Sequence, residues 1–76
     1  MADMTAIREH MEVVGSDGQH VGTVDHVNGN QIKLTRKDPA AGGAHHVIPT
    51  SLVASVDTQV RLSQPAEQVR GSWQAA

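Results

Sequence analysis

Short runs of alternating apolar and polar residues, separated by Gly, Pro, Asn and Asp, dominate this sequence. The clearest run covers residues 32–37, in which Ile32 and Leu34 occupy one face and polar residues the other. A period of two residues is the spacing of a β-strand with one buried face. Runs this short favour a fold of small strands joined by tight turns.

The same pattern gives a complete list of expected elements. It predicts strands at 11–14, 20–27, 32–37, 45–48, 54–56 and 60–62, a helical turn at 50–53, and a short C-terminal helix within 63–73 capped by Ser63. We therefore expect one domain over residues 1–76. Its fold class is all-β with a short C-terminal helix: a small six-stranded antiparallel β-barrel over about residues 7–62.

Turn and bulge residues are expected at six positions: Gly15, Asp17, Gly18, Gly22, Asn28 and Gly29. Gly22 lies among three valines spaced by three residues, so a bulge there would return Val24 to the core face. Asn28-Gly29 predicts a type I′ hairpin turn, which needs positive φ at both central residues.

Composition limits both the core and the chemistry. The branched aliphatic side chains among the 76 residues are ten Val, three Ile and three Leu. Trp73 is the only residue of the Phe, Trp and Tyr class, and there is no Cys. Without Cys there is no disulfide, thiolate metal site or cysteine nucleophile, which is compatible with a cytoplasmic location. A formal net charge of −2 argues against a general nucleic-acid binder.

One stretch resembles a known superfamily. Asp17-Gly18, Val21-Gly22, Val24 and Asp25-His26-Val27 resemble the hairpin signature of the PRC barrel, found in the photosynthetic reaction centre H subunit and in a ribosome maturation factor. Residues 7–11, 32–38, 45–49 and 56–57 are similar, in order, to a family of short bacterial proteins of unknown function related to that barrel.

This resemblance carries implications for fold and function. It implies a six-stranded barrel that acts as a docking module, and it brings no catalytic residue. The chain departs from the superfamily pattern at Gly15, where an acidic residue is frequent, and at His26, where Asp is frequent.

Five histidines are candidate metal ligands or pH sensors: His10, His20, His26, His45 and His46. Adjacent strand residues point to opposite faces, so His45 and His46 do not readily share an ion. A tetrahedral site needs three or four convergent ligands, and the spacing predicts none. We expect exposed histidines that bond to water, with no metal and no cofactor.

Two further features point to partners. Lys33, Arg36, Lys37 and Arg61 form either a basic patch that contacts phosphates or a charged edge strand that resists aggregation. Trp73 either plugs an open end of the barrel or anchors a partner protein or a second copy in a homodimer.

The sequence thus favours a non-enzymatic interaction module that docks through edge strands and the C-terminal segment. The alternative is an RNA- or ribosome-associated accessory protein that uses the four basic residues. The sequence contains no apolar run long enough to span a membrane, so we expect no membrane partner.

Overall fold

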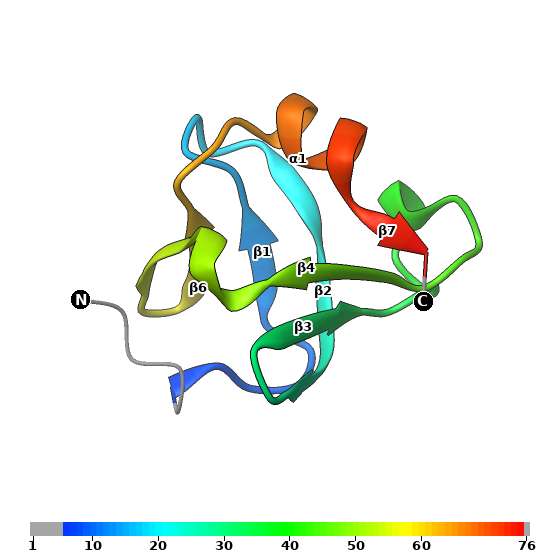
Figure 1. The fold of residues 1–76 in the computed structure, drawn as a ribbon, viewed down its shortest axis with the longest axis horizontal. Coiled ribbons are helices and arrows are strands. Elements are labelled where there is room, and N and C mark those ends of the chain that lie inside the picture. Colours follow the sequence, from blue (N-terminus) through cyan, green and yellow to red (C-terminus); the bar gives the residue numbers. More distant parts are fainter. Residues whose placement is uncertain (1–5, 76) are drawn as a thin grey trace.

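The computed structural model describes residues 6–75 and is built mainly of short strands (Figure 1). The strands are β1 (Glu12–Val14), β2 (His20–Asn28), β3 (Gln31–Leu34), β4 (His46–Pro49), β5 (Val53–Val56), β6 (Gln59–Leu62) and β7 (Gln74–Ala75). Two 3-10 turns, η2 (Pro39–Ala41) and η3 (Thr50–Leu52), and one helix, α1 (Ala66–Ser72), complete the list of described elements. The predicted β-rich fold with one short C-terminal helix is confirmed.

The strands form one sheet in the order β5-β6-β1-β2-β3-β4-β7. The long strand β2 belongs to both halves of this sheet, because its first residues pair with β1 and its later residues pair with β3. The register shifts opposite Val13/Val14 in the first pairing and between Val24 and His26 in the second. These bulges bend β2 and bring both Val21 and Val24 into the core.

The prediction of a closed, wholly antiparallel barrel of six strands is wrong. A seventh strand, β7, lies at one end of the sheet and β5 at the other, so the sheet is open, and β1 pairs with β6 in parallel. The connection explains the opening. Pro49, which has no N–H, ends β4, and only the turn η3 separates β4 from β5, while β7 occupies the outer edge of β4.

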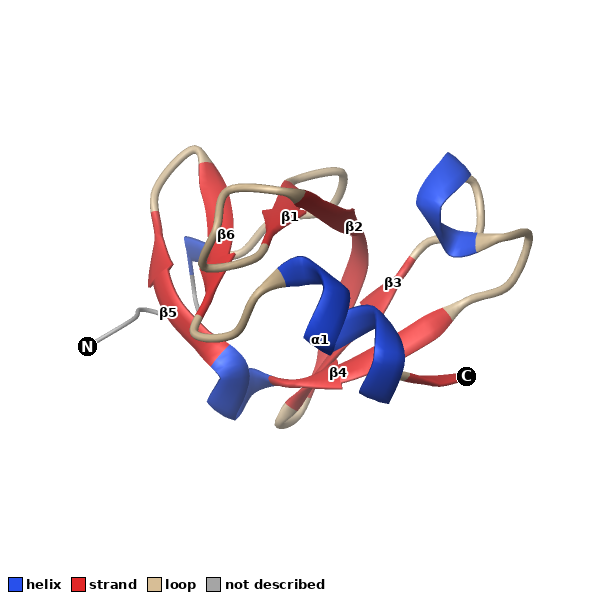
Figure 2. Cartoon of the chain, turned by 90° about the horizontal axis from the view of Figure 1, so that it is seen from above, coloured by secondary structure: helices blue, strands red, loops and turns tan. Residues whose placement is uncertain are grey.

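Helix α1 covers the core on the open side of the sheet. In Figure 2 it lies between the β5–β6 hairpin and β4. Its buried residues Ala66 and Val69 join the cluster formed by the inward faces of the strands. The fully buried aliphatic members of this cluster are Val13, Val21, Val24, Ile32, Leu34, Ile48, Val60, Leu62 and Val69.

The start of α1 is capped from a distance. The prediction that Ser63 caps the helix is wrong, because the N-cap position is Pro65, whose side chain has no acceptor. Asp17, in the β1–β2 turn, instead accepts a hydrogen bond from the Ala66 N–H at 3.4 Å and from the Gln19 N–H at 3.2 Å. Asp17, a turn residue near the start of the chain, therefore holds the first turn of α1, which lies near the end of the chain.

The glycines of the β1–β2 connection have different roles. Gly18 has a φ of +79°, as the predicted turn requires. Gly15 is needed for close approach, since a Cβ there would lie 2.3 Å from the backbone nitrogen of Ala66. Gly22 faces Leu34, whose Cδ1 would lie 3.2 Å from an added Cβ.

The β2–β3 hairpin turns one residue later than predicted. Asn28 ends β2 and pairs with Gln31, so the two central residues are Gly29 and Asn30. Gly29 has a φ of +62°, and Asn30 is not among the described residues with positive φ. The type I′ prediction is therefore wrong, and Gly at the first central position fits a type II′ turn.

Candidate functional site

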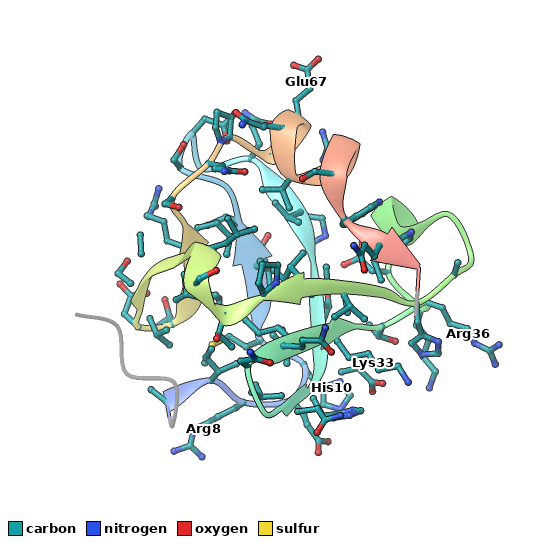
Figure 3. All side chains as sticks on the ribbon, viewed as in Figure 1. Arg8, His10, Lys33, Arg36 and Glu67 are labelled. Atoms are coloured by element: carbon teal, nitrogen blue, oxygen red, sulfur yellow. The ribbon has the colours of Figure 1, made fainter. Side chains whose placement is uncertain are left out.

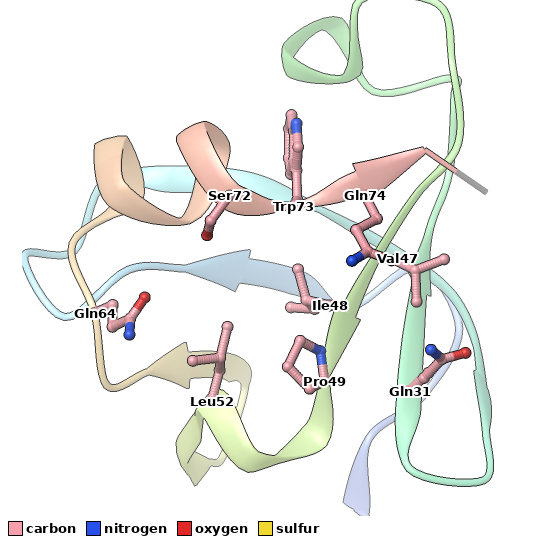
Figure 4. A pocket seen from close by; sticks show the side chains of 9 residues that line it. All are labelled: Gln31, Val47, Ile48, Pro49, Leu52, Gln64, Ser72, Trp73 and Gln74. Atoms are coloured by element: carbon pink, nitrogen blue, oxygen red, sulfur yellow. The ribbon is translucent and has the colours of Figure 1, made fainter.

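A groove opens where the sheet fails to close, between α1 and the β4–η3 segment (Figure 4). Its volume is about 350 Å³. Its lining residues, none of them charged, are Gln31, Val47, Ile48, Pro49, Leu52, Gln64, Ser72, Trp73 and Gln74. We call this site the α1–β4 groove. Its volume lies at the small end of the range for ligand sites, about 300–1,000 Å³.

The groove has an apolar floor and an amide rim. Ile48 at the floor is buried, while Leu52 and Pro49 form its lower wall in Figure 4. Three glutamine side chains lie around it, from β3, from the segment after β6, and from β7. Each primary amide offers both donors and an acceptor, which is the complement that a peptide group presents.

Ser72 is the hydroxyl side chain of this lining. Its Oγ donates to the carbonyl oxygens of Gln68 at 3.1 Å and Val69 at 3.4 Å. This hydroxyl therefore stabilises the last turn of α1 by bonding to backbone carbonyl groups.

Trp73 lies at the junction of helix, groove and edge strand. It is the C-cap residue of α1, its N–H donates to the Val69 carbonyl at 2.8 Å, and its half-buried side chain packs against the core. Its ring stacks on His46, with centroids 4.0 Å apart and an interplanar angle of 15°. Trp73 thus covers part of the open side of the sheet, the position expected of a plug, and also lines the groove, the position expected of an anchor.

A cluster of polar side chains, separate from the α1–β4 groove, is centred on His20 at the start of β2. Nδ1 of its ring lies 2.9 Å from Oε2 of Glu12 on β1, and Nε2 lies 2.7 Å from Oδ2 of Asp38 in the β3–β4 loop. Thr23 donates to the same Asp38 oxygen at 2.6 Å, and Gln59 on β6 donates to Glu12 at 2.6 Å. We call Glu12, His20 and Asp38 the His20 clamp.

The electrostatics of the His20 clamp favour its charged form. Partial burial works to lower the pKa of His20, but hydrogen bonds to Glu12 and Asp38, and the charges of both carboxylates, outweigh it and raise the pKa. The hydrogen bond with His20, followed by the one from Gln59, lowers the pKa of Glu12. The expectation that His20 is an exposed histidine bonded to water is wrong, because two carboxylates lie at its ring nitrogens.

The other histidines do not belong to the His20 clamp, although His10 and His45 line a groove together with Asp38. His26 and His45 flank Asp25, at 3.7 and 3.8 Å from its Oδ2, and His10 has a backbone φ of +68°. His46 stacks on Trp73, and its Nδ1 is buried with no hydrogen-bond partner. In the part of the chain that the structure describes, no three His, Asp or Glu side chains are arranged to hold a metal ion.

The four basic residues are not brought to one place. Lys33, on β3, and Arg36, just after it, lie toward one side of the molecule in Figure 3, opposite Glu67 of α1. Arg36 and Lys37 line a second, polar groove of about 440 Å³, which also contains Asp25 and Asp38. Arg61 lies on β6, which β1 and β2 separate from β3 in the sheet. The described structure therefore holds three basic residues near one end of β3 and the fourth elsewhere.

The sequence analysis did not identify the carboxylates of the His20 clamp or the glutamines of the α1–β4 groove. Glu12 and Asp38 are 8 and 18 residues from His20, and only the bent β2 and the return of the β3–β4 loop bring them together. The glutamines of the α1–β4 groove carried no local signal either. One available signal was Asp38-Pro39, because Asp before Pro favours a turn that starts with a carboxylate.

Fold and site together define a class of protein: a small open-sheet β domain with one covering helix and an uncharged groove at its open edge. A family model described as an uncharacterized protein conserved in bacteria (DUF2171) matches residues 7–70, so the chain belongs to this family. A search among curated proteins finds no match. No helix among the described residues is long and apolar enough to cross a membrane.

Proposed function

We propose that this protein is a non-enzymatic docking module whose α1–β4 groove binds an uncharged, extended segment of a partner protein. The observation that carries the proposal is the groove lining, which combines an apolar floor with three amide side chains and has no charged residue. Burying a charge without a partner is costly, so such a groove selects against charged side chains. An apolar side chain flanked by peptide groups matches both its floor and its rim.

Two further features support a docked segment. The outer edge of β4 is covered by β7 only at His46 and Val47, which leaves the Ile48–Pro49 end beside the groove. Pro49 cannot donate a hydrogen bond to an added strand, so recognition falls to side chains of the groove. Trp73 provides a large, rigid apolar surface of the kind that dominates protein interfaces.

The described structure gives less support to an RNA-associated role. Arg61 lies apart from Lys33, Arg36 and Lys37, and the groove beside Arg36 and Lys37 includes two carboxylates. Phosphate binding gains from several adjacent cations without nearby negative charge. We therefore assign function to the uncharged groove.

A relationship to the PRC barrel, with a docking role in the bacterial cytoplasm, is part of the same proposal. The ordered similarities along residues 7–57, the bent β2 shared by two half-sheets, and the cysteine-free composition support it.

The test is selection of peptides from a display library of random twelve-residue sequences on the immobilised protein, with affinities then measured for purified peptides. A matched pair of variants decides where they bind. Gln64→Glu places a carboxylate in the groove, whereas Gln68→Glu places the same charge on an exposed residue of α1 outside it.

We expect uncharged peptides with a large apolar residue, whose affinity falls about tenfold or more in Gln64→Glu and is unchanged in Gln68→Glu. Peptides that bind both variants equally, or no enrichment at all, would overturn the proposal. Enrichment of segments from this chain's own sequence would overturn the assignment to a foreign partner and indicate a homodimer.

A further inference from the structure

The His20 clamp joins three parts of the chain that are distant in sequence. Glu12 comes from β1, His20 from β2, and Asp38 from the loop between β3 and β4. The side chain of Asp38 is only 4% exposed, against 44% for Glu12, so the ring bridges a buried carboxylate and a solvent-facing one. Neither the fold nor the α1–β4 groove accounts for this arrangement.

Hydrogen-bond chemistry fixes the protonation state of the clamp. A carboxylate only accepts hydrogen bonds, so each ring nitrogen that bonds to one must carry a proton. With both carboxylates ionised, each nitrogen of His20 donates to an oxygen 2.9 Å (Glu12) or 2.7 Å (Asp38) away, and the ring is the doubly protonated imidazolium. Thr23 and Gln59 donate to the same two carboxylates and so reinforce the acceptor role of each.

Other titratable and charged groups lie near the clamp. Asp38 shares the second groove with His10, Asp25, Arg36, Lys37 and His45. Arg70 of α1 donates to the backbone carbonyl of His20 at 2.7 Å. On β6, Arg61 is in register with Val14, the residue that pairs with His20 from β1. The ring itself faces Glu12 on one side and Asp38 on the other.

We infer that the His20 clamp is a proton-operated latch that fastens the β3–β4 loop to β1 and β2 when His20 is protonated and loosens it when the proton is lost. A neutral imidazole has one N–H, so it keeps one carboxylate and presents a lone pair to the other. The remaining bond keeps its carboxylate acceptor but loses the attraction of the positively charged ring, so it weakens as well. Exposed Glu12 turns to solvent, and buried Asp38 is held more weakly.

The latch acts on a defined segment. Asp38 leads into η2, where its carbonyl accepts the Ala41 N–H at 2.9 Å, and the start of the loop is held by the bond from the Thr35 N–H to the Thr23 carbonyl. Arg36 and Lys37 lie between these two attachments, along the second, polar groove. Loss of the proton therefore loosens the loop that carries these two cations.

The primary test uses the unmodified protein. Two-bond ¹H–¹⁵N spectra of the imidazole rings, recorded as pH rises, report how many ring nitrogens of His20 are protonated. Amide hydrogen exchange, expressed as protection factors to remove the intrinsic pH effect, reports how firmly the loop is held.

We expect two protonated nitrogens in His20 at acid pH and one after its transition. The protection factor of the Ala41 amide should fall by roughly tenfold through the same transition, as expected for loss of a hydrogen bond to a charged group. A single protonated nitrogen at acid pH, or protection that does not follow the His20 transition, would overturn the latch.

A pair of variants separates the clamp from general charge effects. Glu12→Gln removes one carboxylate of the clamp and should move the His20 transition to lower pH. Asp25→Asn removes a carboxylate 3.7 Å from His26, outside the clamp, and should leave the His20 transition in place. Equal effects of the two variants would contradict the assignment. Peptide binding in the α1–β4 groove is measured separately, so either proposal can fail alone.

Discussion

Gly15 is a position at which a single added methyl group has an effect that can be worked out from distances in the structure. A Cβ at Gly15 would lie 2.3 Å from the backbone nitrogen of Ala66, 2.9 Å from its Cα and 2.9 Å from Oδ1 of Asp17. Ordinary van der Waals contact begins at 3.4 Å, so Gly15→Ala must push the start of α1 away by about 1 Å.

That displacement disturbs several contacts together. The Ala66 N–H loses the Asp17 carboxylate, and the bond from the Ser16 N–H to the Gln64 carbonyl, 2.9 Å long, is strained. Overpacking costs about 1–3 kcal/mol and loss of the cap about 1 kcal/mol, while replacing Gly returns about 0.4–1 kcal/mol through the unfolded chain. We expect a net loss of about 1–3.5 kcal/mol.

This loss is large for such a short chain. At roughly 0.05–0.15 kcal/mol per residue, a domain of this size has a free energy of unfolding of about 4–11 kcal/mol. Urea unfolding, followed by far-UV circular dichroism and by the fluorescence of the single Trp, measures the change directly. Thermal unfolding should show a fall in Tm of about 4–28 °C.

Two other glycines serve as controls. Gly71 lies in α1 with nothing within 4 Å of an added Cβ, so Gly71→Ala should stabilise by roughly 0.5–1 kcal/mol. Gly18 is equally open but has a φ of +79°, so Gly18→Ala should cost about 1–2 kcal/mol from backbone conformation alone. A Gly15→Ala protein as stable as Gly71→Ala would refute the close-approach argument.

Three further predictions concern the core, the cap and pH. Leu62→Ala, at a fully buried position, should reduce the free energy of unfolding by about 2–5 kcal/mol in urea titrations. Asp17→Ala should cost about 1 kcal/mol, whereas Asp57→Ala, which removes a similar turn bond to Gln59 without a helix, should cost less in the same assay. His20 stabilises the fold below its ordinary pKa of 6.5 and loses this contribution as pH rises through its raised folded pKa, while Glu12 contributes above about 4.5 and loses its contribution as pH falls through its lowered folded pKa. The Tm measured by thermal unfolding should therefore be highest between about pH 4.5 and 6.5. His20→Gln should reduce the fall in Tm on the alkaline side of this window, and an unchanged profile of Tm against pH would contradict the clamp.

The strands were predictable from the sequence because each carries its own alternation. Val13, Ile32, Leu34 and Leu62 all lie in predicted strands and are buried. The hairpin was predicted in the right place, but its turn is one residue later, because bulges in β2 set the register and local propensity does not. Alternation indicates which face is buried and gives no information about sheet order.

The two candidate sites were predictable only in part, because each is formed by residues that are distant in sequence and meet only in the folded chain. Trp73 was identified from its rarity, and it does line the groove. The clamp around His20 was not, because its carboxylates arrive from another strand and from a loop that composition described only as rich in Gly and small residues. Asp38 is almost fully buried, a placement that polar residues adopt only where partners exist.

The opening of the sheet and the position of the groove have one cause. Closing the barrel would require the two ends of the sheet to pair, but β7 covers the outer edge of β4, and the chain passes from β4 to β5 through Pro49 and a three-residue turn. Helix α1 therefore covers the exposed core in place of a strand pair. The helix has seven residues and buries Ala66 and Val69, and the gap beyond its last turn is the α1–β4 groove. The α1–β4 groove is thus a consequence of how the strands are connected, and it needs no larger core than sixteen branched aliphatic residues provide.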